Sequence, residues 1–260
     1  MIKVYKNGKD FIDENFKYLE TNKYMSTFFF FDAPLLKEST KINYAIKVEE
    51  DNKILLALKV EPYNLLLFGD DYCLDSLLNY LIKENYIFDG IMCSSSIGNR
   101  LLEISSNFYQ SLGLDFMEAK NITEESSEEV IVATEKDIDE IFEMTSLFIN
   151  ECGLGDTPNK EGITKFISRY RIIRVNDKIV SMAAYSANND ESFRITYVYT
   201  RPSFRGKGYA RKVVNRVKND IIKNGKIATL NVDQKNPISN HLYKSLGFNK
   251  IFSQGIYLKK

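Results

Sequence analysis

The sequence is short of histidine and cysteine. Its 260 residues include one histidine, His241, and three cysteines, Cys73, Cys93 and Cys152, none of them in a Cys-x-x-Cys pair. A single imidazole and scattered thiols give no metal-binding spacing, so we expect no metal site. An odd number of scattered cysteines also gives no disulfide framework, which is typical of the reducing cytosol. We therefore expect a cytoplasmic protein.

The sequence also lacks net charge and long apolar runs. Lysine and arginine total 35, as do aspartate and glutamate, so charge favours neither nucleic acid nor an anionic membrane as partner. The first residues, Met1–Phe16, include acids and lack the apolar core of a signal peptide. The run Phe28–Phe31 is far shorter than the roughly 18 residues of a membrane span. What remains is a globular composition, 44% hydrophobic and 27% charged, long enough for two domains.

A polar, acidic stretch divides the chain. The segment "AKNITEESSEE", residues 119–129, has no apolar periodicity and is predicted to be a linker. We therefore expect one domain over residues 1–120 and a second over residues 129–260.

The second half alternates strand and helix patterns, which predicts an α/β fold with a mixed sheet. Thr134 is the expected N-cap of its first helix, Gly153 the stop of that helix, and Gly225 the stop of a later one. The predicted order is a strand (128–134), two helices (134–153 and 156–170), three strands (171–175, 178–187 and 192–200), a helix (210–225), a strand (226–232), a helix (237–247) and a strand (248–258).

The first half resembles the second. "YAIKVEEDNKILLALKV" parallels "YRIIRVNDKIVSMAAY", with Lys53 opposite Lys178, and "NFYQSLGLDFM" parallels "NHLYKSLGFNKI", with Tyr109 opposite Tyr243. The offsets, 178 − 53 = 125 and 243 − 109 = 134, are similar, which indicates a tandem repeat at domain scale. We therefore expect two related domains.

A glycine loop follows the strand pattern that ends at Thr200. In "RGKGYA", Gly206 and Gly208 permit positive φ angles and close approach of a ligand to the backbone. The first amides of the following helix lack intrahelical partners and, with the helix dipole, suit a phosphate. Arg205 and Lys207 add positive charge. The alternative is a surface turn with incidental basic residues.

Two other phosphate-binding motifs fit this loop poorly. A Walker loop needs Ser or Thr after its lysine, whereas Gly208 follows Lys207. A dinucleotide-binding fingerprint needs a third glycine where Arg211 stands, and the next predicted strand ends in Asn231 and Val232 rather than in an acid.

With a second motif downstream, the loop resembles that of the GNAT superfamily of acetyl-CoA-dependent N-acyltransferases. The family's pyrophosphate loop reads Arg/Gln-x-x-Gly-x-Gly/Ala, and Arg205, Gly208 and Ala210 match it. The family's N-x-x-A/S-x-x-L-Y-x-x-x-G-F element is matched by Asn236, Ser239, Leu242, Tyr243, Gly247 and Phe248. The resemblance covers residues from about Glu129 onward and extends weakly over the first half, as in two-domain members with a degenerate amino-terminal copy.

The resemblance implies the GNAT fold, in which the strand before the loop splays from the next parallel strand. Main-chain groups at the end of that strand would bind the pantetheine arm and the thioester carbonyl and would stabilise the oxyanion of a tetrahedral intermediate. The residues so implied to bind acetyl-CoA are Val198, Tyr199, Thr200, Arg205, Gly206, Lys207, Gly208, Tyr209, Ala210, Arg211, Asn236, Ser239 and Tyr243.

The resemblance also makes Tyr243 the general acid that protonates the departing thiolate, against the alternative of a core tyrosine. The general base stays open. Glu151, Glu191 and Asp233 are candidates, and each also reads as a solvated surface acid.

Two further side chains are candidates for the acceptor pocket. Tyr197 and Arg194 lie in one predicted strand, where strict alternation places them on opposite faces. His241, beside the cofactor helix, is expected to be an exposed polar residue.

The first half lacks the glycine loop. Its counterpart, "LLLFGDDYCLDSLL", has one glycine, Gly69, followed by Asp70 and Asp71, whose charges repel a pyrophosphate. We expect this half to have lost the cofactor and to act as a scaffold.

The sequence thus predicts an acetyl-CoA-dependent N-acetyltransferase without a metal, in which a primary amine of a small molecule or peptide attacks the thioester directly. The protein is expected to be a monomer or homodimer. The alternatives are a non-catalytic acyl-CoA-binding sensor and a nucleotide-binding module that uses the same loop.

Overall fold

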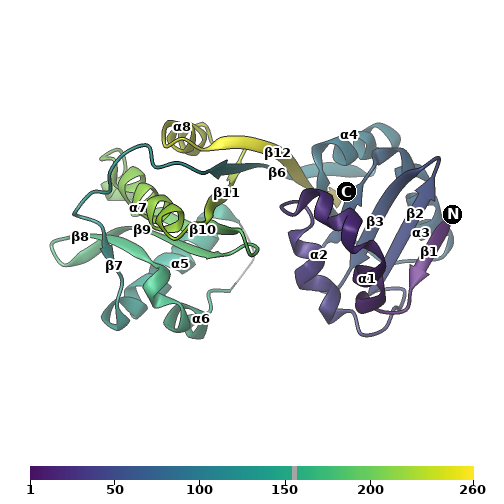
Figure 1. Ribbon diagram of the computed structural model, residues 1–260, viewed down its shortest axis with the longest axis horizontal. Coiled ribbons are helices and arrows are strands. Elements are labelled where there is room, and N and C mark those ends of the chain that lie inside the picture. Colours follow the sequence, from purple (N-terminus) through teal and green to yellow (C-terminus); the bar gives the residue numbers. More distant parts are fainter. Residues whose placement is uncertain (154–156) are drawn as a thin grey trace. The chain divides into compact units, whose positions relative to one another are not determined.

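The computed structural model describes residues 1–153 and 157–260, which form two compact units (Figure 1). Unit 1 comprises Met1–Phe116, Asp233–Lys235 and Phe252–Lys260, and unit 2 comprises Met117–Val232 and Asn236–Ile251. The end of the chain therefore belongs to unit 1, although the linker-based boundaries assign it to the second domain. In the described ranges no helix has both the length and the apolar character needed to cross a membrane.

Unit 1 is a mostly antiparallel sheet with helices on both faces. Its strand order is β1-β2-β3-β4-β5-β12, and only β4 and β5 among these neighbours are parallel. Its elements are β1 (Ile2–Tyr5), α1 (Gly8–Leu19), α2 (Thr27–Asp32), β2 (Tyr44–Glu50), β3 (Lys53–Lys59), β4 (Leu65–Gly69), α3 (Leu74–Lys83), β5 (Gly90–Ser94), α4 (Ser95–Ile104), most of β6 (Phe108–Ala119) and most of β12 (Asn249–Lys259).

Continuous apolar runs along the strands of unit 1 give the sheet two apolar faces. In β3, Leu55 and Ala57 join a core cluster with residues of α3 and α4, whereas Leu56 and Leu58 join a cluster with residues of α1 and α2. The side chain of Tyr257, from β12, is buried in the first of these clusters. The last strand of the chain thus completes the core of the first unit.

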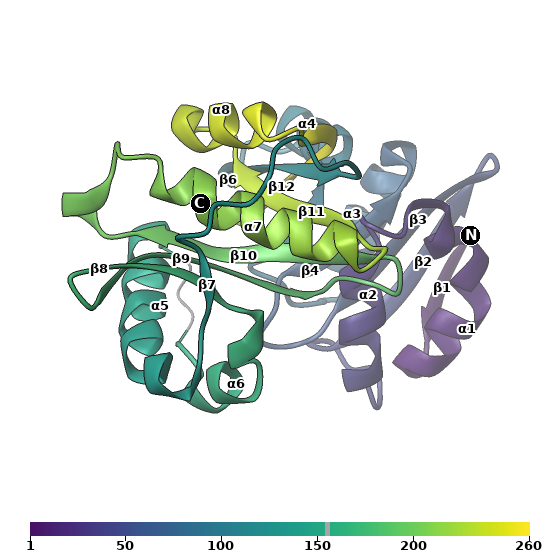
Figure 2. The same ribbon diagram turned by 60° about the vertical axis from the view of Figure 1, so that its left-hand side comes forward.

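The strands of unit 2 follow one another in the order β11-β10-β9-β8-β7 and are mixed in direction, with a parallel pair of β10 and β11. Helix α7 covers one face, and α5 and α6 lie on the other (Figure 2). Its elements are β7 (Ile131–Val132), α5 (Ile138–Cys152), α6 (Lys160–Lys165), β8 (Arg171–Val175), β9 (Lys178–Ala187), β10 (Ser192–Thr200), α7 (Tyr209–Lys223), β11 (Ile227–Asp233) and α8 (Pro237–Ser245).

The predicted order of elements in the second half is confirmed. Thr134 forms a capping box with Asp137, and Gly153 ends α5 with a left-handed φ of 61°. The helix predicted over residues 156–170 is shorter, since α6 is followed by a separate 3₁₀ turn at Ile167–Arg169. The start of that predicted helix, Asp156, lies outside the described residues.

The hairpin part of the proposed repeat is confirmed. Asp51 and Asn52 turn between β2 and β3 with φ angles of 47° and 62°, and Asn176 and Asp177 turn between β8 and β9 with 49° and 61°. Two consecutive left-handed residues suit a two-residue turn between twisted antiparallel strands. Both units therefore contain the same tight hairpin.

The second part of the repeat alignment is wrong. Tyr109 lies in strand β6 and Tyr243 in helix α8, so the two tyrosines are not equivalent. The alignment relied on the shared letters "SLG". In the first unit, however, these letters belong to a strand, which begins at the buried Phe108 stacked on Phe88. By order along the chain, the counterpart of α8 is α4.

The predicted linker is hydrogen-bonded to helix α7 of unit 2. We call residues 120–129 the strap. The buried side chains of Asn219 and Asn215 donate from Nδ2 to the carbonyl oxygens of Glu124, at 2.9 Å, and Glu125, at 3.0 Å. A low-periodicity segment thus follows α7 closely, since polar residues on that helix satisfy its carbonyls.

Candidate active site

The two parallel strands of unit 2 separate part-way along their length. Strand β10 pairs with β11 over Ser192–Arg194 and then continues to Thr200, while β11 continues to Asp233. Over that final stretch the backbone groups of β10 that point toward β11 are released from this ladder. Such groups can bind a ligand that enters between the strands.

A β-bulge lies in the separated part of β10. Thr196 pairs with Ala184 and Tyr199 with Met182, so Tyr197 and Val198 stand opposite one residue of β9. Tyr197 has a φ of 51°, an uncommon conformation for a bulky residue, and such strain is often found at functional sites.

The bulge overturns the expectation that Arg194 and Tyr197 face opposite sides. Ile195 and Val198 pack with the α7 side of the sheet, whereas Tyr197 and Tyr199 pack with the α5 side. Arg194 alternates with Ile195 and therefore shares the α5 side with Tyr197. Burial lowers the pKa of Arg194, and a smaller electrostatic interaction with Tyr197 opposes that change.

The glycine loop opens the amino terminus of α7. Gly206 and Gly208 have φ angles of 77° and 78°, and a Cβ on either would meet no described atom within 4 Å. Gly208 is the N-cap residue of α7, and among the described residues no side chain caps the helix there. The first amides of α7 thus follow two glycines with free space around them and, with the positive end of the helix dipole, are suited to an anion.

Two arginines fix the loop to the sheet and to α5. Arg201 is buried, donates from Nε to the carbonyl oxygen of Ile179 at 2.8 Å, and forms an ion pair with Glu143 at 2.9 Å. Arg205 donates from Nε to the carbonyl oxygen of Thr200 at 2.9 Å. Sequence reasoning missed Arg201, because no motif marks an arginine whose partner lies 58 residues away.

Arg205 also contacts a candidate base. Its Nη2 lies 2.6 Å from the Oε2 of Glu151 at the end of α5, and both side chains are about half exposed. This hydrogen bond raises the pKa of Arg205. The structure therefore brings Glu151 to the loop, where it forms an ion pair.

Tyr243 of α8 lies in the apolar cluster beside the loop. It is 7% exposed, and Val198, Phe204 and Tyr209 pack against the same cluster. Burial raises its pKa to about 12, and the Cys152 thiol contributes further. The phenol is therefore protonated at neutral pH and has a proton to donate, although the same burial fits a core tyrosine.

Asn236 organises the start of α8. Its Oδ1 accepts a hydrogen bond from the backbone amide of Ser239 at 3.0 Å, so the side chain is the N-cap of the helix. Pro237 occupies the first helical position, as its missing N–H allows.

The remaining candidates lie elsewhere. Glu191 is exposed and precedes β10, so seven residues of strand, roughly 23 Å, separate it from Val198. His241 is exposed on α8, as expected, and Asp233 counts with unit 1. Within the described part of the chain, no three side chains of His, Cys, Asp or Glu group together as metal ligands do.

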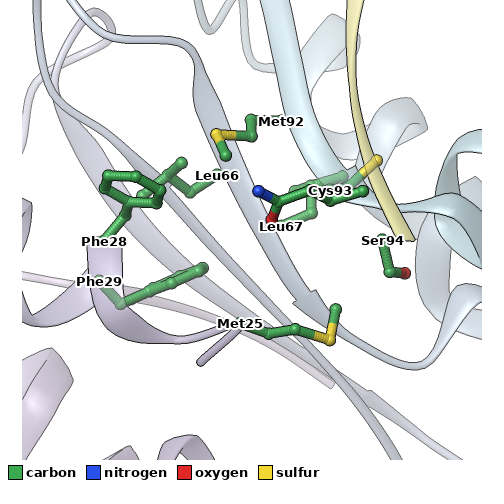
Figure 3. A pocket seen from close by; sticks show the side chains of 9 residues that line it. Met25, Phe28, Phe29, Leu66, Leu67, Met92, Cys93 and Ser94 are labelled. Atoms are coloured by element: carbon green, nitrogen blue, oxygen red, sulfur yellow. The ribbon is translucent and has the colours of Figure 1, made fainter. Parts of the chain in front are cut away.

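Unit 1 has a similar separated strand pair. Strands β4 and β5 pair at Leu65–Ile91 and Leu66–Met92. A cavity of only about 10 Å³ lies beside these strands (Figure 3). Its lining residues are Met25, Phe28, Phe29, Leu66, Leu67, Met92, Cys93, Ser94 and Gln254.

Acidic side chains occupy the loop position of unit 1. The Oδ1 of Asp70 accepts a hydrogen bond from the backbone amide of Tyr72 at 3.0 Å, and its other oxygen pairs with Lys53 at 3.0 Å. These bonds hold the pKa of Asp70 below its usual value. A carboxylate thus satisfies an amide that, in an open loop, would face a ligand.

Comparisons with known proteins agree with this geometry. Residues 173–256 match the model of the FR47-like protein family, and no curated protein matches the chain. A GNAT-family acetyltransferase from Colwellia psychrerythraea has 12% identity and a TM-score of 0.69, with 100% of this chain and 99% of that chain covered. A GCN5-related N-acetyltransferase from Sphaerobacter thermophilus has 13% identity and a TM-score of 0.57, with 83% and 80% covered.

A further solved structure shares both units. A tandem GNAT protein from the clavulanic acid biosynthesis pathway has 7% identity and a TM-score of 0.54, with 100% of this chain and 98% of that chain covered. The fold that the resemblance implies is therefore confirmed: the chain has the GNAT fold in its two-domain form.

Proposed function

We propose that unit 2 is an acetyl-CoA-dependent N-acetyltransferase. The observation that carries this proposal is the pair of left-handed glycines, Gly206 and Gly208, which open the amino terminus of α7 beside a strand separated from its parallel neighbour. The fold and the family match over residues 173–256 support it.

The loop would bind the pyrophosphate of acetyl-CoA. The amides from Gly206 to Arg211 would donate to phosphate oxygens, and the side chains of Arg205 and Lys207 would add charge. Main-chain groups of Val198, Tyr199 and Thr200 would bind the pantetheine arm and thioester carbonyl. Asn236 and Ser239 would border the same arm from the start of α8.

The reaction would be direct transfer of the acetyl group. The amine nitrogen attacks the thioester carbon, a C–N bond forms, and the C–S bond breaks once the tetrahedral intermediate collapses. An amide of β10 stabilises the oxyanion, and Tyr243 supplies the proton that the departing thiolate takes. The proton released by the amine leaves through water or Glu151, which lies nearer the loop than Glu191.

The acceptor would be a primary amine of a small molecule or peptide, and the protein would act as a monomer or homodimer. The side chains of Tyr197 and Arg194, on the α5 side of β10, would border that acceptor. The amine itself is not specified by these residues, because the GNAT fold serves many acceptors.

Calorimetry and a thiol-release assay test the proposal. Coenzyme A should bind without magnesium, ATP should bind far more weakly, and at least one amine of a broad panel should release thiol from acetyl-CoA. Binding of coenzyme A without turnover on any amine would favour the sensor alternative. Preference for ATP would overturn the proposal in favour of a nucleotide-binding module.

A further inference from the structure

The arginines of the glycine loop already have anionic partners. Arg205 pairs with Glu151 of α5 at 2.6 Å, and Arg211, in the first turn of α7, pairs with Glu124 of the strap at 2.9 Å. All four side chains are between 38% and 52% exposed. Such half-exposed ion pairs contribute little free energy, so an incoming anion can exchange with them.

Glu124 is held near Arg211 independently of that ion pair. Its backbone carbonyl accepts a hydrogen bond from Asn219, whose side chain is fully buried. The neighbouring Thr123 accepts at Oγ1 from the buried amine of Lys218, at 2.7 Å. The backbone of Glu124 therefore stays fixed to α7 whether or not its carboxylate pairs with Arg211, which keeps that carboxylate within reach of the arginine.

Arg205 is also positioned by a second contact. Its Nε bonds to the carbonyl oxygen of Thr200, which fixes the guanidinium at the end of β10. Glu151 approaches it from α5, so the carboxylate is replaceable while the arginine stays in place. Each arginine thus carries a charge that its glutamate partly neutralises.

We propose that Glu124 and Glu151 are built-in competing anions that make the loop selective for ligands with several phosphate groups. This inference rests on the proposed function. A phosphate near either arginine must displace a carboxylate or share the guanidinium with it. Coenzyme A, with a pyrophosphate and a further phosphate, can satisfy both arginines, whereas 4′-phosphopantetheine, with one phosphate, can satisfy at most one.

Calorimetry on matched variants tests this inference. Glu124→Gln and Glu151→Gln should each tighten coenzyme A binding by about three- to fivefold, the range that an exposed ion pair supports. The double variant should combine both gains, about tenfold or more, because the pairs are on different elements. For 4′-phosphopantetheine the double variant should show no more than one of these gains.

Glu129→Gln is the matched control. Glu129 pairs with Lys212, next to Arg211 on α7, at 2.8 Å, so its removal changes net charge equally without freeing a loop arginine. Its affinity for coenzyme A should stay within about twofold of the wild type, and the gains of the other variants should shrink in high salt.

The outcomes separate this inference from the proposed function. If the wild type binds coenzyme A and the two variants bind it equally or more weakly, the glutamates are not competitors and the inference fails alone. Equal gains for Glu129→Gln would reduce the effect to net charge and also overturn it. If neither the wild type nor any variant binds coenzyme A, the proposed function fails as well.

Discussion

Units 1 and 2 share a hairpin with two left-handed residues and a parallel strand pair that separates part-way. They differ at the loop after the fourth strand of this pattern. In unit 2, Gly208 opens the helix terminus, whereas in unit 1 Asp70 bonds to the backbone amide of Tyr72. The same scaffold therefore occurs with an open glycine loop and with a loop whose backbone amide is satisfied by a carboxylate.

Apolar side chains also lie beside the strand pair of unit 1. In unit 1, Met25, Phe28 and Phe29 line a cavity of about 10 Å³ beside the strand pair, about the size of one water molecule. We therefore expect a ligand to meet two obstacles in unit 1, one electrostatic and one steric. Removing only one of them should not restore a site.

The largest expected effect is on the acid step of unit 2. Tyr243→Phe keeps the ring in the apolar cluster but removes the proton donor, so we expect acetyl transfer to fall by on the order of 100-fold or more, with coenzyme A binding retained. Steady-state thiol release and calorimetry measure both. Unchanged transfer would leave Tyr243 as a core residue only.

The same variant has a pH signature. In the native state the pKa of Tyr243 is raised to about 12, so the native protein binds more protons than the unfolded chain between pH 10 and 12. Its contribution to stability is therefore complete below pH 10 and is lost as the pH rises toward 12. Tyr243→Phe should show a smaller alkaline loss of stability in urea titrations at pH 9 to 11.5.

The next effect is on the core of unit 1. Tyr257→Ala should lower the free energy of unfolding by about 3–5 kcal/mol, because it removes a buried aromatic ring. Tyr109→Ala, on the exposed face of β6, should cost little. Denaturant titration distinguishes the two. Equal, small losses would show that β12 does not complete this core.

A glycine pair tests the loop of unit 2 at a smaller scale. Gly208 and Gly225 stand at opposite ends of α7 with φ angles of 78° and 72°, and neither has a described atom within 4 Å of a Cβ position. Valine at either introduces the same backbone strain. Only Gly208→Val should weaken the binding of coenzyme A, by at least about tenfold in dissociation constant. Equal affinity in both variants would contradict a phosphate site at the loop.

Removing the acidic charges of the unit 1 loop is expected to have no effect on coenzyme A binding. The double substitution Asp70→Asn and Asp71→Asn removes the acidic charges of unit 1, but Phe28 and Phe29 still fill the region beside its strand pair. Calorimetry should give the same coenzyme A stoichiometry as the wild type. A second binding event would mean that charge alone separates the units.

Local patterns made much of unit 2 predictable. Thr134 caps the 3₁₀ turn that leads into α5, and Gly153 ends that helix. Both are capping patterns visible in neighbouring residues, and the glycine loop precedes α7 as expected. The bulge at Tyr197 was not predictable, because Tyr197, Val198 and Tyr199 are consecutive large side chains and hide the shift in alternation that an extra residue causes. The alternation argument for Arg194 failed for that reason.

Contacts between distant segments were equally hidden. Nothing near Glu124 indicates that it meets Arg211, 87 residues later, and an acidic stretch reads as a linker. The alignment of Tyr109 with Tyr243 was wrong because it relied on three shared residues and ignored that the residues around Phe108 form a strand. The open loop was predicted from its residues, whereas the ion pairs around it needed the fold.

Because β12 is the last strand of the chain, the core of unit 1 can be completed only at the end of synthesis. Gly98 leaves room for the ring of Tyr257, since a Cβ there would lie 1.9 Å from its hydroxyl oxygen. A ribosome that has finished unit 1 up to Phe116 must add 257 − 116 = 141 residues before that ring exists. At about 5–20 residues per second this takes roughly 7 to 28 s. During that interval unit 1, although it is made first, lacks the Tyr257 ring in its core.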